Sequence, residues 1–214
     1  MTQDMTVGSP MKVIFRFFIP VMLGNLLQQL YNLVDAMIVG QSLGVTALAA
    51  VGASTSVMFL ILGFCNGCAG GFGIPVAQCF GAKDYSGLRR CVANTFYLSG
   101  IIAVVFTTVT AIFCRDILEA MNTPADVIDG AYDYLLITFL GIPFTFGYNV
   151  LASIIRSLGD SKTPFMYLML AAVLNIILDV VFILGLNLGT GGAALATLVS
   201  QAISAVLCLR HMYK

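Results

Sequence analysis

The chain has 214 residues, of which 59% are hydrophobic and only 9% are charged, and its mean hydropathy is +0.98. Soluble domains carry roughly 25% charged residues, so this composition excludes an ordinary soluble domain and indicates a protein that lies in the lipid bilayer. The formal net charge is zero and no basic cluster alternates with aromatic residues, which argues against a nucleic-acid partner.

Six apolar runs follow one another along the chain, each long enough to cross a bilayer. A helix of about 20 apolar residues spans a hydrocarbon core of about 30 Å. Glycine, asparagine and proline residues, which favour turns, separate the runs. We therefore predict an all-α membrane protein, a bundle of six transmembrane helices that forms a single lobe over residues 1–214. The predicted spans cover residues 13–39, 47–77, 91–114, 131–155, 164–186 and 191–210.

The first span contains polar residues within an apolar sequence, LQQLYNLVDAMIVG. They recur at spacings of three and four, which puts them on one face of a helix, and this face should meet protein or water rather than lipid. The residues are Asn25, Gln28, Gln29, Asn32 and Asp35. Pro20 removes a backbone hydrogen bond earlier in the same helix and should permit a bend.

The second span contains Cys65 and Cys68, which have the CxxC spacing of redox and zinc sites. No second pair and no nearby histidine completes such a site, so we expect neither a metal nor a redox role. All six cysteines are predicted to be reduced.

The last three spans carry further polar residues. The fourth offers Tyr134 and Asn149, with Pro143 expected to kink the helix between them. In the fifth, Asn175 and Asp179 are four residues apart and therefore stack on one helical face. The sixth has a polar stripe that includes Thr197 among apolar neighbours. Such amides and hydroxyls often serve only as hydrogen bonds between helices, and this alternative stays open for them.

Asp35 and Asp179 are harder to explain by packing alone. Apart from Arg16 near the start of the first span and Arg210 at the last position of the sixth, no basic residue lies within the predicted spans, so neither acid has an expected counter-ion. An unpaired carboxylate in low dielectric is costly, and each acid must be protonated, hydrated or neutralised by a cation. Carboxylate, amide and hydroxyl oxygens suit a proton or an alkali cation better than a soft metal.

The basic residues are biased to one side of the bundle. If the spans alternate, the N-terminus, the second-to-third connector, the fourth-to-fifth connector and the C-terminus share that side. It carries nine of the ten basic residues: Lys12, Arg16, Lys83, Arg89, Arg90, Arg156, Lys162, Arg210 and Lys214. Positive charges in short connectors stay in the cytoplasm. We therefore predict a multi-pass protein of the cytoplasmic membrane with both termini cytoplasmic.

Four motifs follow one another along essentially the whole chain, namely IPVMLGNLLQQLYNLVDAMIVGQSLG, FGAKDYSGLRR, RSLGDSKTP and LNIILDVVFILGLNLGTGGAALAT. Together they resemble the N-terminal half of the multidrug and toxic compound extrusion (MATE) family of cation-coupled exporters. The resemblance implies two six-helix lobes around a central cleft, with a cation or proton site in the N-terminal lobe. Family membership would assign that site, for Na⁺ or H⁺, to Asp35, Asn175, Asp179 and Thr197, with the Ala193 carbonyl as a possible further ligand.

The same resemblance implies a helix bend at Pro20 and polar cavity positions at Tyr134 and Asn149, and Gln28 of the polar stripe joins this expected cavity or coupling set. The predicted function is an antiporter, not an enzyme, without a cofactor, in which Na⁺ or H⁺ drives export of amphipathic, often cationic organic compounds. The chain ends after one lobe, so its expected partner is a missing second lobe or a second copy of itself.

Two alternatives are weaker. A lipid-linked precursor flippase of similar architecture should line its cavity with basic residues, which the predicted spans lack. An intramembrane aspartyl protease should carry the motifs YD and GxGD, whereas Asp35 lies in LVD and Asp179 in IILD.

Overall fold

The computed structural model of the chain describes residues 9–212. Within that range the chain is helical, with short connectors and no strand, which confirms the all-α prediction. The elements are α1 (Pro10–Leu43), α2 (Val45–Gly81), α3 (Tyr85–Ile112), α4 (Cys114–Ala120), α5 (Ile128–Leu140), α6 (Ile142–Ser157), α7 (Lys162–Asp179), the π-helical segment η1 (Val180–Gly185) and α8 (Gly189–Met212).

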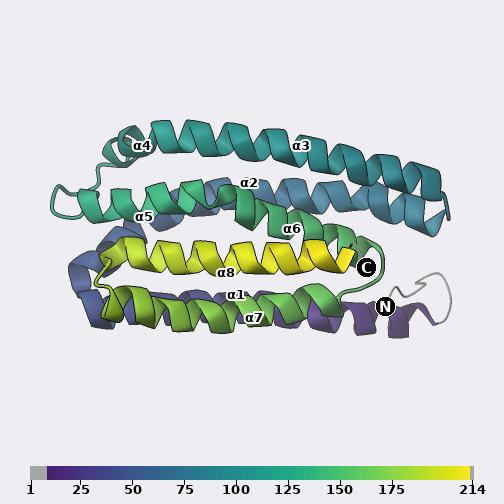
Figure 1. Cartoon of the computed structure of the whole chain (residues 1–214), viewed down its shortest axis with the longest axis horizontal. Helices are drawn as coiled ribbons and strands as arrows, with labels where there is room; N and C mark the ends of the chain where they lie inside the picture. The colour runs from purple at the N-terminus through teal and green to yellow at the C-terminus, as the bar shows by residue number, and fades with distance from the viewer. Residues whose placement is uncertain (1–8, 213–214) are drawn as a thin grey trace.

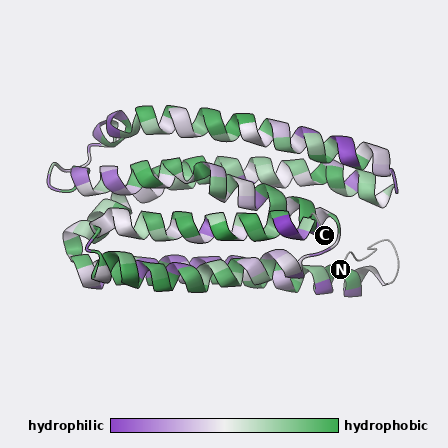
Figure 2. Cartoon of the chain, viewed as in Figure 1, coloured by the Kyte–Doolittle hydropathy of each residue, from purple (hydrophilic) through white to green (hydrophobic). Residues whose placement is uncertain are grey.

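The long helices run along one common axis (Figure 1). The start of α1, the α2–α3 connector, the α6–α7 connector and the end of α8 lie at one end of the bundle, while α4 and the α4–α5 connector lie at the other. Apolar residues cover the helices along their length, and the polar residues gather mainly toward the two ends (Figure 2). The basic residues predicted for one side belong to the segments at the first end, except Lys214, which lies outside the described residues.

Five helices of the described chain are individually long and apolar enough to cross a membrane, namely α1, α2, α3, α7 with η1, and α8. The remaining predicted span, 131–155, coincides with α5 and α6, which are bent by 46° relative to each other and make a sixth crossing if counted as one. The bend lies at Gly141, and Pro143 follows it in the first turn of α6. Because proline has no N–H, it cannot continue the hydrogen-bond ladder of α5, which explains the kink.

Helix α6 lies in the centre of the bundle, where it packs against α2, α3 and α8. Its approach to α2 is close because Gly73 of α2 has no side chain. The Ser157 hydroxyl donates a 2.8 Å hydrogen bond to the Gly73 carbonyl. A Cβ at Gly73 would lie 2.5 Å from Ser153 Oγ and 2.8 Å from Ser157 Oγ, so any larger residue must displace them.

Replacing Gly73 by Ala should therefore destabilise the bundle by about 1–3 kcal/mol, the usual range for overpacking. Gly71, two residues earlier on α2, is exposed, and a Cβ there would meet no atom within 4 Å, so Gly71→Ala is the matched control. It should be neutral or stabilising by up to about 1 kcal/mol, because Ala favours helix more than Gly does. Unfolding in mixed micelles with increasing dodecyl sulfate, followed by circular dichroism, measures both. Equal effects of the two variants would contradict this packing.

Two aspartates form hydrogen bonds that order the connectors at the end of the bundle where the basic residues gather. Asp84 precedes α3, and its carboxylate accepts a 3.0 Å hydrogen bond from the Gly87 N–H, which holds the pKa of Asp84 below its ordinary value. Asp160 precedes α7 in RSLGDSKTP. Burial alone would raise the pKa of Asp160, but the interactions of its carboxylate, among them hydrogen bonds from the hydroxyl and N–H of Thr163, outweigh burial and lower it. Both connectors are thus ordered by local hydrogen bonds.

Candidate functional site

The two intramembrane acids come together in the interior of the lobe. Asp35 belongs to α1 and Asp179 is the last residue of α7, and these two helices pack against each other. Asp35 is only 8% exposed and Asp179 is fully buried. Their carboxyl groups are close enough to interact directly. The two acids therefore do not lie on opposite outer faces of the bundle, an arrangement in which they could not act together.

Asn175 and Thr197 complete the predicted side-chain set. Asn175 lies one turn before Asp179 on α7, and its amide nitrogen donates a 3.2 Å hydrogen bond to the Thr197 hydroxyl of α8. This bond orients the Asn175 amide so that its oxygen is left as an acceptor without a donor. Three helices, α1, α7 and α8, thus supply the four side chains.

The cluster has far more acceptors than donors. In the described part of the chain, seven buried side-chain atoms have no hydrogen-bond partner, and five of them belong to this cluster. They are Asp35 Oδ1, Asn175 Oδ1, both carboxylate oxygens of Asp179, and Gln201 Oε1. Because buried polar atoms are normally paired, this group of unpaired oxygens indicates a place for protons or a cation.

Tyr31 and Gln201 are members that sequence reasoning did not assign to the site. The Tyr31 hydroxyl faces the side chains of Gln28 and Gln201 and lies within electrostatic range of both acids. Their helical spacing could have identified them. Tyr31 is one turn before Asp35 and Gln201 is one turn after Thr197, so each lies on the same helical face as a predicted residue.

Tyr134 of α5 also faces the acids and is buried beside them. The sequence placed it near a cavity, and the structure puts it in the wall of the acid cluster. It packs there with Val39, Ile183 and Ala193 in an apolar group. Ala193 is fully buried and lies inside α8, where helix geometry directs its carbonyl toward the Thr197 N–H. A ligand role for that carbonyl stays a prediction.

The helix changes type immediately after Asp179. From Val180 to Gly185 the backbone forms the π-helical segment η1, and the Leu186 N–H donates to the Val181 carbonyl, five residues back, at 2.9 Å. Such wider turns occur frequently at functional sites because they reposition the neighbouring side chains. Within residues 9–212, no group of three or more His, Cys, Asp or Glu side chains comes together.

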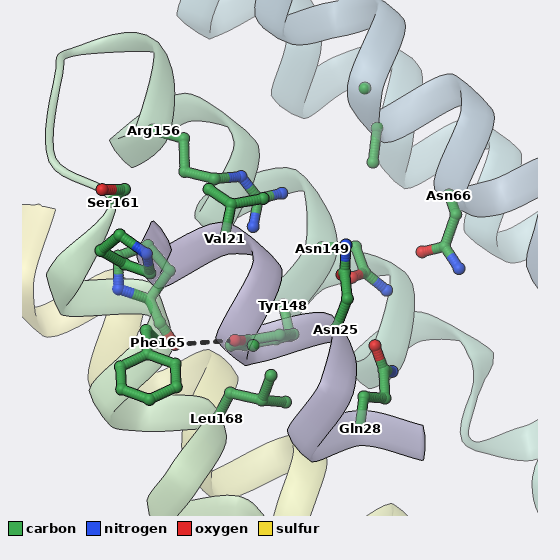
Figure 3. A pocket seen from close by; sticks show the side chains of 15 residues that line it. Val21, Asn25, Gln28, Asn66, Tyr148, Asn149, Arg156, Ser161, Phe165 and Leu168 are labelled. Atoms are coloured by element: carbon green, nitrogen blue, oxygen red, sulfur yellow. Dashed lines mark hydrogen bonds between the residues drawn. The ribbon is translucent and has the colours of Figure 1, made fainter. Parts of the chain in front are cut away.

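A separate cavity of about 290 Å³ lies between α1, α2, α6 and α7 (Figure 3). Three of the four residues predicted for the cavity or for coupling line it, namely Pro20, Gln28 and Asn149. The amides of Asn25, Gln28, Asn66 and Asn149 gather on one side of it (Figure 3). Pro20 lies inside α1, which continues as one helix from Pro10 to Leu43.

Arg156 also lines this cavity, which corrects the prediction that no basic residue other than Arg16 and the terminal Arg210 lies in a span. The predicted span ended at residue 155, but α6 continues to Ser157 and carries Arg156 as a half-buried residue into the cavity wall. The error came from assigning a charged residue to a connector. A long side chain can keep its charged group in a polar cavity while its stem lies within the bundle.

The polar stripe of α1 does not face one environment. Asp35 is buried and Gln28 is half-buried, whereas Asn25, Gln29 and Asn32 are exposed on the surface of this lobe. The prediction that the stripe meets protein or water rather than lipid therefore stays a prediction for these three residues. Its exposed members leave a polar surface on α1 that needs a further neighbour in a membrane.

Residues 20–181 of the chain match the sequence model of the MatE family. The chain belongs to the MATE family of multidrug efflux transporters. The probable multidrug resistance protein YoeA of Bacillus subtilis (strain 168) is 36% identical over all of this chain. Two crystal structures of a MATE transporter, one in the bent and one in the straight conformation, superpose with TM-scores of 0.90 and 0.89 at 31% identity, each over 96% of this chain.

The chain spans about half the length of the relatives it matches. It covers 47% of YoeA and 46% of each of the two MATE structures. It therefore corresponds to the N-terminal half of the family architecture, as the motifs predicted. The relatives in this family are transporters rather than enzymes, so neither the protease nor the flippase alternative is favoured.

Proposed function

We propose that this lobe is the ion-coupling half of an antiporter, in which inward movement of Na⁺ or H⁺ drives export of amphipathic organic compounds. The observation that carries the proposal is the group of five buried, unpaired oxygens around Asp35, Asn175, Asp179 and Gln201. A site of this composition gains free energy when it takes up a cation, because the cation replaces the donors that these oxygens lack.

Two negative carboxylates in a dry site repel each other, so the pair should hold at least one positive ion or proton when the site is closed to water. Na⁺ would be held by Asp35, Asn175, Asp179 and Thr197, and protons by the two acids. Release of the ion leaves uncompensated charge, which favours a conformation that admits water. Coupling follows because the ion then binds one conformation better than the other.

The moving part proposed here is α1. It carries Asp35 in the acid cluster and Pro20 in the wall of the cavity, so a bend at Pro20 would change the shape of the cavity while the acids change their charge. Similar MATE structures have been solved in a bent and in a straight conformation, and the existence of two conformations in such proteins is consistent with this proposal.

The distribution of charge supports an orientation with both termini in the cytoplasm. The α2–α3 connector, with Lys83, and the α6–α7 connector, flanked by Arg156 and Lys162, lie at the same end of the bundle as the start of α1 and the end of α8. Positive charges at such connectors are retained in the cytoplasm. In this orientation the acidic connector around Asp126 and Asp129 faces the outside of the cell. The membrane would be the cytoplasmic membrane.

The second lobe would pack against the exposed polar face of α1. Asn25, Gln29 and Asn32 are exposed there beside large apolar residues such as Leu26 and Leu30. Polar side chains at membrane depth need protein or water as neighbours, so this face would line the central cleft between two lobes. A second six-helix lobe, or a second copy of this chain, would supply the other wall.

Transport in sealed vesicles tests the proposal. The chain, expressed alone and fused to a second MATE lobe, is reconstituted into liposomes loaded with the fluorescent cation ethidium, and a Na⁺ or pH gradient is imposed. We expect ethidium to move only when one of these gradients is present, and the effective gradient identifies the coupling ion. Equal movement with and without gradients would refute coupling. Movement by the fusion alone would show that a second lobe is needed.

A further inference from the structure

The wall of the cavity beside Pro20 contains a positively charged residue. Arg156 is the only charged residue in its wall, whose other lining residues are polar amides, hydroxyls, Gly, Ala, Pro and apolar groups. Within residues 9–212, no acidic side chain lies within ion-pair distance of Arg156. A half-buried guanidinium without an acid partner leaves the cavity with a net positive charge.

The polar neighbours of Arg156 on α6 carry no negative charge. The Tyr148 hydroxyl, which also lines the cavity, donates a 3.0 Å hydrogen bond to the Pro164 carbonyl, and the Asn149 amide nitrogen donates one of 2.9 Å to the Thr145 carbonyl, so neither group neutralises the guanidinium. Asn149 lies seven residues, two helical turns, before Arg156 and therefore shares its face of α6. In Figure 3 the Arg156 side chain lies on the opposite side of the cavity from the amides of Gln28 and Asn66.

Apolar side chains form another part of the same wall. Val21, Phe165 and Leu168 lie next to the polar groups (Figure 3), so a ligand with an anionic group and an alkyl or aromatic body would match both. A guanidinium is suited to phosphate, sulfonate and carboxylate groups because its planar donors bind two oxygens at once. The cavity is centred away from the acid cluster, since Asp35 lies two helical turns, roughly 10 Å, beyond Gln28, the cavity residue nearest to it along α1.

We propose that this cavity is a binding subsite for amphiphiles with an anionic or zwitterionic headgroup, and that Arg156 binds the negative group. The inference deepens the proposed export function by adding a substrate class, since it supplies a place for negative charge in addition to the cation site at Asp35 and Asp179. The same headgroup chemistry is found in anionic membrane lipids and in exported anionic amphiphiles.

Binding of matched decyl compounds tests the subsite. The purified chain in neutral maltoside detergent is titrated calorimetrically with decyl phosphate, and separately with decyltrimethylammonium, below their micelle-forming concentrations. Arg156→Gln should weaken decyl phosphate binding by roughly tenfold or more, and Arg156→Lys by less, because lysine keeps the charge but not the planar donor geometry. Neither variant should weaken binding of decyltrimethylammonium.

Arg210→Gln is the matched control, since Arg210 is an exposed basic residue at the end of α8. It should leave decyl phosphate binding unchanged, and an equal loss in this variant would reduce the effect to general surface charge and overturn the proposal. Unchanged binding by folded Arg156→Gln would also overturn it. Should that variant not fold, the wild-type chain decides, because binding decyl phosphate no better than decyl maltoside would contradict the subsite.

An experiment in nanodiscs distinguishes a membrane lipid from an exported compound as the occupant of the subsite. If the occupant is a membrane lipid, replacing part of the phosphatidylcholine by phosphatidylglycerol should weaken decyl phosphate binding to the wild type but not to Arg156→Gln. If the occupant is an exported compound, the lipid change should have no effect. Asp179→Asn should still bind decyl phosphate, so a failure of ion coupling leaves this test intact.

Discussion

Replacing Asp179 by Asn should reduce cation-driven transport at least tenfold, the largest effect expected of any single substitution in this lobe. The side chain is fully buried and neither of its carboxylate oxygens has a hydrogen-bond partner. Asparagine has nearly the same shape but cannot carry the charge that an exchanging ion or proton neutralises. Asp35→Asn should have the same effect, since the two carboxyls act as one site. The measurement is gradient-driven ethidium movement in reconstituted vesicles.

A structural role would give a different result from a coupling role. Removing an unpaired buried carboxylate should leave the stability of the lobe unchanged or higher, because the desolvation penalty of the charge disappears. Asp133→Asn is the control, as Asp133 is exposed near the start of α5. We expect normal transport in the control, and lost transport with retained folding in the two site variants. Normal coupled transport in both site variants would contradict the assignment of Asp35 and Asp179 to the ion site.

Replacing Pro20 by Ala should slow coupled transport severalfold or more while leaving ion binding intact. Proline within a helix costs about 3 kcal/mol relative to alanine, because it removes a hydrogen bond and clashes with the preceding turn. Alanine restores that bond and so favours a straight α1. Each 1.4 kcal/mol changes a population tenfold, so even part of this difference would trap the helix in one state.

Pro75→Ala provides the comparison for the hinge. Pro75 also lies inside a transmembrane helix, α2, but it is exposed and does not line the cavity. Its replacement should stabilise α2 similarly without slowing transport. Transport rate and ion binding are measured on the same preparations, and a parallel loss of both in Pro20→Ala would point to damage of the site rather than to a hinge.

The acid cluster could be predicted from sequence because charge is rare at membrane depth. Asp35 and Asp179 stood out against apolar neighbours, and the four-residue spacing from Asn175 to Asp179 fixed a common face. What the sequence could not provide was the approach of α1 to α7, since contacts between helices depend on packing over the whole bundle. The structure supplies it, together with the Asn175–Thr197 hydrogen bond.

Sequence reasoning missed a change of helix type and the positions of two side chains inside the bundle. The π-helical segment after Asp179 lies within VVFILG, an apolar stretch with no glycine or proline before Gly185 to signal it. Tyr31 shares a helical face with Asp35, but only the structure places its hydroxyl beside Gln201. Arg156 seemed to be a cytoplasmic anchor, because its position one residue beyond the predicted span is typical of such anchors.

The coupling mechanism requires that Asp35 and Asp179 together hold an exchangeable cation or proton. Infrared difference spectroscopy of the purified lobe observes the carbonyl stretch of protonated carboxyl groups directly, as pH is lowered or Na⁺ is added. We predict a band that appears with protonation, or disappears with Na⁺ binding, in the wild type and is absent from the double variant Asp35→Asn/Asp179→Asn. Identical difference spectra for the wild type and the double variant would show that the two acids hold no such ion.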